Sequence, residues 1–228
     1  MTILQPPETS KIKMDFLVLA VCIGLVNCGV SAKVQQTESS KSVKIEGRSE
    51  MQTAANLQES RLNSTNHDQA AMLFDRAIQS LELGQQDKAM DELRQVVSLA
   101  PSLSVPHNNL GILYKRKGLL DKAIEEYQQA LRLKPDYAEA YNNLGIAYRE
   151  KGMFKEAETA YREALRLKSD LVETHFNLGV LCELYLNRPA EAVQHYKDYL
   201  RLGGSRSQEV ELWISVLQQK LQSLQPSP

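Results

Sequence analysis

The chain has 228 residues, enough to bury a sizeable core in one or two domains. Its 27 basic and 28 acidic residues leave a net charge of −1, so charge gives no reason to expect binding to nucleic acid or to an anionic membrane. Three cysteines and four scattered histidines predict neither a disulfide framework nor a metal site, and we expect no cofactor. Aromatic residues make up only 6% of the chain, and Ala, Leu, Glu, Lys, Gln and Arg recur throughout, which favours helix over sheet.

The first 32 residues have the layout of a signal peptide or N-terminal anchor. Lys11 and Lys13 precede an apolar run at 16–26, and small residues then lead to Ala32. A positive region, a short apolar region and a small-residue cleavage site are typical of an export signal. The apolar run of 11 residues would span about 16 Å as a helix, whereas a bilayer core is about 30 Å thick.

Three fates of this segment stay open. The residues Leu25-Val26-Asn27-Cys28 resemble a bacterial lipobox, in which the cysteine becomes the lipidated first residue, although Asn27 replaces the usual small residue. Cleavage after Ala32 with soluble release is the second interpretation, and an uncleaved anchor is the third. All three predict an exported protein, periplasmic or membrane-anchored in a bacterial cell envelope. The chain would then touch the membrane only through its N-terminal segment or a lipid on Cys28.

A polar segment follows the signal. Residues 33–67 are rich in Ser, Gln, Glu, Lys and Asn and contain few large apolar side chains. Such a segment cannot bury enough apolar surface to offset the entropy lost on ordering. We therefore expect a flexible linker.

From Ala70 the sequence repeats itself every 34 residues. The triplet Asn-Leu-Gly at 109–111 returns at 143–145 and again at 177–179. The other recurring residues are Tyr114 and Tyr148; Ala89, Ala123 and Ala157; Tyr127 and Tyr161; Ala130 and Ala164; and Pro101 and Pro135. A period of this length indicates stacked units, each of which buries its apolar face against its neighbours.

This pattern resembles the tetratricopeptide repeat (TPR), a helix–turn–helix unit. The first unit is degenerate, with Arg76-Ala77 in place of Leu-Gly, and the fourth has one extra residue in its turn. The resemblance implies an all-α fold, a right-handed superhelix or α-solenoid of about four repeats. The predicted array spans 70–204, divided into the units 70–103, 104–137, 138–171 and 172–204.

The end of the array requires a cap. Val210, Trp213, Leu217 and Leu221 follow the glycine pair at 203–204 with helical spacing. We expect residues 205–228 to form a capping helix and a tail, with Trp213 covering the edge of the fourth unit. The alternative is that Trp213 anchors a partner.

The resemblance also implies a concave groove lined by the first helix of each unit. The position before Leu-Gly usually faces this groove, and it holds Asp75, Asn109, Asn143 and Asn177. An Asn side chain both donates and accepts hydrogen bonds, so a ladder of Asn can hold the backbone of an extended peptide. The alternative is that Asn is simply common at this position in TPR units of many functions. The predicted groove residues are Asn109, Asn143, Asn177, Asn108, Asn142, Lys115 and Arg149, with Ile112, Ile146 and Val180 as apolar neighbours.

A clamp of the co-chaperone type is not expected. In that TPR class, Lys and Arg at set groove positions hold an acidic C-terminus. The corresponding positions here include Glu139 and Glu173, which would repel a carboxylate.

The sequence predicts no enzyme. It contains no Gly-rich phosphate loop, no H-E-x-x-H motif and no Ser/His/Asp or Cys/His arrangement. His107 and His175 occupy equivalent positions two units apart and are interpreted as packing residues. Cys182 replaces a repeat Tyr and is expected to be buried and unreactive.

We therefore expect a non-catalytic scaffold or adaptor that binds a protein or peptide partner. The order of signal, linker and array resembles bacterial lipoproteins that help to assemble pili or outer-membrane barrels, which implies an assembly factor. The alternatives are a self-associating structural module and a regulatory subunit of an envelope enzyme.

Overall fold

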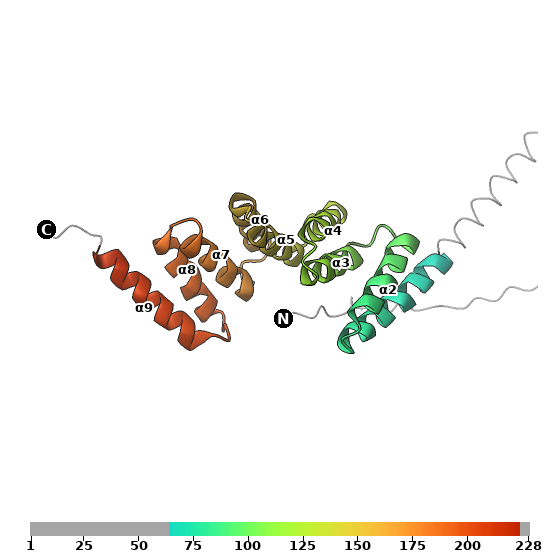
Figure 1. The fold of residues 1–228 in the computed structure, drawn as a ribbon, viewed down its shortest axis with the longest axis horizontal. Coiled ribbons are helices and arrows are strands. Elements are labelled where there is room, and N and C mark those ends of the chain that lie inside the picture. The colour runs from blue at the N-terminus through green and yellow to red at the C-terminus, as the bar shows by residue number, and fades with distance from the viewer. Residues whose placement is uncertain (1–63, 224–228) are drawn as a thin grey trace, which may run out of the picture. The chain divides into compact units, whose positions relative to one another are not determined.

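The computed structural model describes residues 64–223 (Figure 1), and this part of the chain contains no strand. The chain divides into two units, residues 1–51 and 52–228, and every described residue belongs to the second. Residues 64–82 are helical. The helices that follow are α2 (Gln86–Leu99), α3 (Ser104–Arg116), α4 (Leu120–Leu133), α5 (Ala138–Glu150), α6 (Phe154–Leu167), α7 (Val172–Leu184), α8 (Pro189–Arg201) and α9 (Ser207–Ser223).

The N-terminal predictions fall largely outside the described residues. This holds for the export signal at 1–32, for Cys28 and for positions 33–63 of the predicted linker. Positions 64–67, which composition assigned to the linker, are instead helical. They begin a helix whose positions Ala70, Leu73 and Ala77 are buried, and packing of those side chains stabilises a helix that polar composition alone would not predict. Within 64–223, no helix has the length and apolarity needed to cross a bilayer.

Consecutive helices form hairpins that stack in chain order. The pairs α3 with α4, α5 with α6, and α7 with α8 make the most extensive contacts, and each pair then packs against the next. Among the described helices, successive first helices also contact each other, α3 with α5 and α5 with α7. This nearest-neighbour pattern is that of an all-α solenoid of helix–turn–helix repeats.

Three of the described hairpins close on a contact between a glycine and a tyrosine. A Cβ atom placed on Gly145 of α5 would lie 2.6 Å from Cδ1 of Tyr161 on α6, and Gly111 and Gly179 meet Tyr127 and Tyr196 in the same way. The tyrosine rings are completely buried. The recurring glycine therefore exists because the ring of the second helix occupies the space that any side chain would need.

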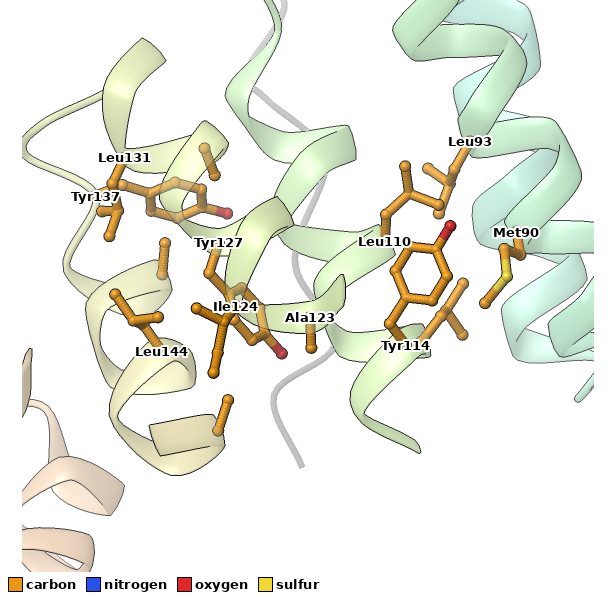
Figure 2. Close-up of a cluster of buried hydrophobic side chains, with 14 of the residues drawn as sticks. Met90, Leu93, Leu110, Tyr114, Ala123, Ile124, Tyr127, Leu131, Tyr137 and Leu144 are labelled. Carbon is orange, nitrogen blue, oxygen red and sulfur yellow. The ribbon is translucent and has the colours of Figure 1, made fainter. Parts of the chain in front are cut away.

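Large side chains fill the space between neighbouring hairpins. Figure 2 shows Tyr114 of α3 beside Met90 of α2, while Ile124 and Tyr127 of α4 lie near Leu144 of α5. All five belong to one continuous buried cluster. The aromatic and aliphatic positions of the repeat thus join the units, and the small positions close each unit on itself.

The turns within the hairpins explain one irregularity of the repeat. Three residues separate α5 from α6, and Gly152 adopts a left-handed conformation there with φ of 80°. Four residues separate α7 from α8, and Asn187 takes the left-handed conformation with φ of 53°. Asn tolerates this region better than most side chains. The extra residue of the fourth unit is therefore accommodated in its turn.

Helix α9 caps the last hairpin, as the sequence predicted. Val210, Ile214 and Leu217 are buried against α8, and Trp213 lies with its ring centroid 5.9 Å from that of Phe176 and 5.8 Å from that of Tyr196. Ile214 was absent from the predicted contact face.

Candidate functional site

The first helices of the stacked hairpins share one continuous face. Because α5 contacts both α3 and α7, side chains at equivalent positions of these helices follow one another from unit to unit. We call the partly exposed part of this surface the first-helix face. It is defined by Asn143, Ile146 and Arg149 of α5 and by Asn177 and Val180 of α7.

The asparagines of neighbouring units are hydrogen-bonded to each other. Nδ2 of Asn143 donates to Oδ1 of Asn108 at 3.0 Å, and one unit later Nδ2 of Asn177 donates to Oδ1 of Asn142 at 3.2 Å. The hydroxyl of Thr174 also donates to Oδ1 of Asn142, at 3.0 Å. Adjacent asparagines therefore link one repeat to the next, a role that the sequence analysis did not assign to them.

Two predicted groove residues are not accessible in this structure. Asn108 is 0% exposed and Asn109 is 5% exposed. The Oδ1 atom of Asn108 accepts from Asn143, and its Nδ2 is buried without a hydrogen-bond partner among the described residues. The position of Asn108 is thus corrected from the groove surface to the contact between repeats, because its side chain lies beneath the Asn143 amide.

The predicted basic residues are already partly engaged. Nζ of Lys115 lies 3.5 Å from Oε1 of Glu150, across the contact of α3 with α5. Arg149 is half-buried, and its Nε has no partner among the described residues. The pairing with Glu150 reduces the positive charge that Lys115 can present to a ligand.

Charged residues of the third unit and of the C-terminal end of the array are also paired. Arg206, just before α9, lies 3.3 Å from Glu173 of α7, and its guanidinium carbon lies 3.8 Å from the centre of the Phe176 ring. Glu139 of α5 is held by Lys168 at 3.3 Å. The two acidic positions that argue against a carboxylate clamp therefore serve as ion-pair partners within the array.

A family model and several solved structures match this chain. Residues 102–170 match the model described as tetratricopeptide repeat. The pilF structure from Pseudomonas aeruginosa aligns with a TM-score of 0.61 and 24% identity over 70% of this chain and 72% of that one. MamA aligns with a TM-score of 0.56 and 22% identity, covering 65% and 86% of the two chains. No curated protein sequence matches.

Residues 102–170 are tetratricopeptide repeats, and the described helices have the fold of TPR proteins. The first TPR of Spaghetti (RPAP3), solved with a bound HSP90 peptide, is also similar, with a TM-score of 0.50 and 22% identity over 51% of this chain and 92% of that one. Likeness at these identities shows the fold. The TPR fold is, in general, that of a protein-interaction scaffold.

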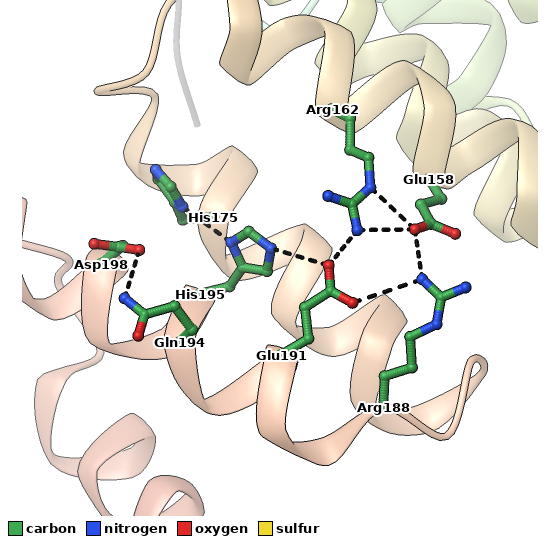
Figure 3. A network of polar contacts seen from close by, with 8 residues as sticks. All are labelled: Glu158, Arg162, His175, Arg188, Glu191, Gln194, His195 and Asp198. Atoms are coloured by element: carbon green, nitrogen blue, oxygen red, sulfur yellow. Dashed lines mark hydrogen bonds and ion pairs between the residues drawn. The ribbon is translucent and has the colours of Figure 1, made fainter.

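A polar network that the sequence analysis missed joins the third and fourth units. Glu158 of α6 accepts hydrogen bonds from Arg162 and from Arg188, and Arg162 also reaches Glu191 of α8 (Figure 3). Burial raises the pKa of Glu158, but the hydrogen bonds from the two arginines outweigh it and the pKa falls below its ordinary value. A signal was available in the sequence, since Cys182 stands 34 residues after Tyr148 and replaces the Tyr of the repeat.

The histidines are less scattered than the sequence suggested. Nδ1 of His175 on α7 lies 3.3 Å from Nδ1 of His195 on α8. His107, at the equivalent position two units earlier, instead contacts a carboxylate, with its Nδ1 at 2.7 Å from Glu126. The linear separation of His175 and His195 concealed their contact, which arises because the hairpin folds α8 back along α7.

Cys182 is buried beside this network, as predicted. Burial, together with the nearby carboxylates of Glu191 and Glu158, raises the pKa of its thiol to about 12. The thiolate is therefore scarce at neutral pH, and the residue is a poor nucleophile.

Proposed function

We propose that the chain is a non-catalytic adaptor that binds an extended segment of a partner polypeptide along its first-helix face. The observation that carries the proposal is the repeated pair Asn143 and Asn177. Each residue is partly exposed, and one N–H of its side-chain amide donates to an asparagine of the neighbouring repeat. The second N–H and the carbonyl oxygen can therefore pair with a peptide backbone.

Apolar neighbours support the same occupant. Ile146 and Val180 lie three residues beyond the two asparagines, on the same side of α5 and α7, and both are partly exposed. The asparagine side chains can pair with the backbone of an extended ligand. The aliphatic side chains beside them can contact the apolar side chains of the same ligand. Lys115, Glu139 and Glu173 are each paired with an opposite charge, so these residues give no reason to expect a strongly acidic or basic ligand.

A photo-activatable amino acid can test this assignment in the source cell. We expect insertion at Ile146 and at Val180 to give one shared adduct of defined mass, because both positions face the same ligand. Glu125 on α4 and Thr159 on α6 are exposed positions on second helices and serve as controls. Equal adducts from the control positions would argue against the face as a binding site.

We further propose that the chain acts in the bacterial cell envelope, as an assembly factor. The proposal is supported by the signal-like order of Lys11, Lys13, the apolar run at 16–26 and Cys28. Lipidation predicts that Cys28→Ala moves the protein from the membrane to the soluble fraction and removes a lipid from the mature mass. Unchanged fractionation together with an N-terminus at residue 33 would favour cleavage after Ala32.

A self-associating module is the second candidate. On α9, Leu212 is 62% exposed and Val216 is 56% exposed, one helical turn apart. Apolar side chains on a terminal helix can pair with a second copy. Sedimentation over a range of concentrations separates the candidates, since an adaptor of this kind stays monomeric and a self-associating module does not.

A further inference from the structure

The fourth repeat brings together three side chains of the kind that bind transition metals. They are His175 of α7 and His195 and Asp198 of α8, and one ligand atom from each lies within 4.8 Å of the others. His195 and Asp198 are three residues apart, so they project from the same side of α8. Figure 3 shows His175 opposite them, across the α7–α8 hairpin.

The separation of the two imidazoles matches a tetrahedral metal site. Their Nδ1 atoms are 3.3 Å apart. With Zn–N bonds of about 2.0–2.1 Å at a tetrahedral angle, two ligating nitrogens lie about 3.3–3.4 Å apart. An ion can therefore bridge these atoms with little movement of either ring.

The second ring nitrogen of His175 is already fixed. Its Nε2 lies 3.0 Å from the backbone oxygen of Ser169. A carbonyl oxygen only accepts, so Nε2 carries the hydrogen and Nδ1 presents its lone pair towards His195. A histidine that ligates a metal through one nitrogen commonly donates from the other to a backbone carbonyl in this way.

The second ring nitrogen of His195 also lies near a hydrogen-bond acceptor. Its Nε2 lies 3.9 Å from Oε1 of Glu191. When Nδ1 binds a metal, the imidazole proton must reside on Nε2, where Glu191 can accept it after a small rotation. Burial lowers the pKa of His195, which favours the neutral form of the ring that a cation requires.

Asp198 would supply the third ligand. Burial raises the pKa of its carboxyl, but hydrogen bonds from Gln194 and Arg201 outweigh this and lower the pKa overall. Gln194 contacts Oδ2 at 3.2 Å and Arg201 contacts Oδ1 at 3.0 Å. A carboxylate has about four lone-pair directions, so either oxygen retains room for a metal. Arg201 is exposed and can turn into solvent.

We propose that His175, His195 and Asp198 form a binding site for a divalent transition metal of the Zn²⁺ class, with water as the fourth ligand. Two nitrogens and one oxygen from buried and half-buried side chains suit zinc better than magnesium or calcium, which prefer oxygen ligands. Bound metal would clamp α7 to α8 in the last repeat. It would stabilise that hairpin by mass action.

The competing set in the same region shares His195. Cys182, Glu191 and His195 also place their ligand atoms within 4.8 Å of one another. The thiol of Cys182 would have to lose its proton, which the raised pKa disfavours. Glu191 is moreover held by Arg162 and Arg188.

The experiment uses the full chain without a polyhistidine tag, titrated with Zn²⁺ and with Co²⁺ in a non-chelating buffer. We expect one ion per chain, a visible Co²⁺ spectrum of tetrahedral type, and a higher melting temperature. His175→Gln and His195→Gln should each weaken binding by at least about tenfold, since loss of even a supporting residue commonly weakens it 10–100-fold.

His107→Gln is the matched control, because His107 occupies the same repeat position but faces Glu126. Binding should be unchanged in that variant. The chain has four histidines, so in the unmodified protein Zn²⁺ should shift two sets of ring NMR signals, those of His175 and His195. This measurement does not depend on any variant folding.

Three results would overturn the proposal. The first is the absence of saturable binding. The second is equal loss in His107→Gln. The third is loss in Cys182→Ser with full retention in Asp198→Asn, which would assign the metal to the competing set.

Discussion

Asn143 donates its side-chain amide to the buried carbonyl oxygen of Asn108 across the contact between two repeats, at 3.0 Å. Asn108 is completely buried, so water cannot replace the donor if Asn143 is lost. Asn177 makes the corresponding bond to Asn142, but there Thr174 donates to the same oxygen. The two asparagines of the first-helix face therefore differ in how much the fold depends on them.

This difference predicts unequal effects on stability. Asn143→Ala leaves a buried acceptor unpaired, and we expect the free energy of unfolding to fall by about 1–3 kcal/mol. Asn177→Ala leaves Asn142 with Thr174 as a donor, and we expect a loss below about 1 kcal/mol. Urea unfolding followed by circular dichroism measures both. Equal losses would show that the hydrogen bond to Asn108 carries no special weight.

The same comparison decides which variant should probe ligand binding. Asn177→Ala is expected to weaken partner capture while the fold is retained, whereas Asn143→Ala changes both. The sequence placed these residues at one repeat position but gave no means to separate them, because the distinction arises from neighbours on other helices.

Substitution of the repeat glycine should destabilise the protein despite favouring helix. A Cβ at position 145 would lie 2.6 Å from the Tyr161 ring, which is completely buried. Gly→Ala in a helix interior normally adds about 1 kcal/mol of stability. We expect overpacking to outweigh this, with a net loss of about 1–3 kcal/mol for Gly145→Ala. Thermal unfolding provides the measurement, and a gain in stability would contradict the close contact.

The repeat itself was predictable because its period is carried by residues that pack locally. Gly145 and Tyr161 recur at fixed offsets, and the structure shows that they touch. The burial of Asn108 and the pairing of His175 with His195 were not predictable. Both depend on which side chains of different helices come into contact. The repeat pattern does not predict such contacts at positions where the sequences of the units differ.

The degenerate first repeat contains a buried carboxylate that should make stability sensitive to acid. Glu92 of α2 accepts from Ser80 at 2.8 Å and from Arg76 at 3.0 Å, and its side chain is 3% exposed. Burial raises its pKa, but these hydrogen bonds outweigh that effect and the folded pKa lies below the ordinary value of 4.5. The resulting stabilisation is present above pH 4.5 and is lost as the pH falls through the folded pKa.

Glu92→Gln should therefore lower stability at pH 7 by about 1–3 kcal/mol, because a charged acceptor is replaced by a weaker neutral one. The difference from wild type should shrink as the pH is lowered below 4.5. Urea unfolding at pH 7, 5, 4 and 3 tests the slope, with the exposed Glu125→Gln as the control. A difference that is constant with pH would exclude a role for ionised Glu92.

The first repeat also shows why its sequence departs from that of the other units. Arg76 stands where other units have Leu, so it looked like a degenerate position. In the structure it pairs with Glu92 across the hairpin, and polar contacts replace part of the apolar packing.

Trp213 should be a stabilising residue of the capping helix. It is partly buried, and its ring lies against Phe176 of α7 and Tyr196 of α8, so it covers the edge that a fifth repeat would otherwise occupy. Trp213→Ala removes these contacts, and we expect the free energy of unfolding to fall by about 2 kcal/mol, less than for a fully buried tryptophan. Leu212→Ala, on the exposed side of α9, should change stability by less than about 0.5 kcal/mol.

Because the chain contains a single tryptophan, its fluorescence in the wild type reports on the capping helix alone. We expect fluorescence and circular dichroism to give the same urea midpoint if the cap unfolds together with the array, as the contacts of Trp213 with two helices of the last unit require. An earlier fluorescence midpoint would show that α9 detaches first. In that case Trp213→Ala should leave the main transition unchanged, and the tryptophan would be better assigned to a partner contact than to capping.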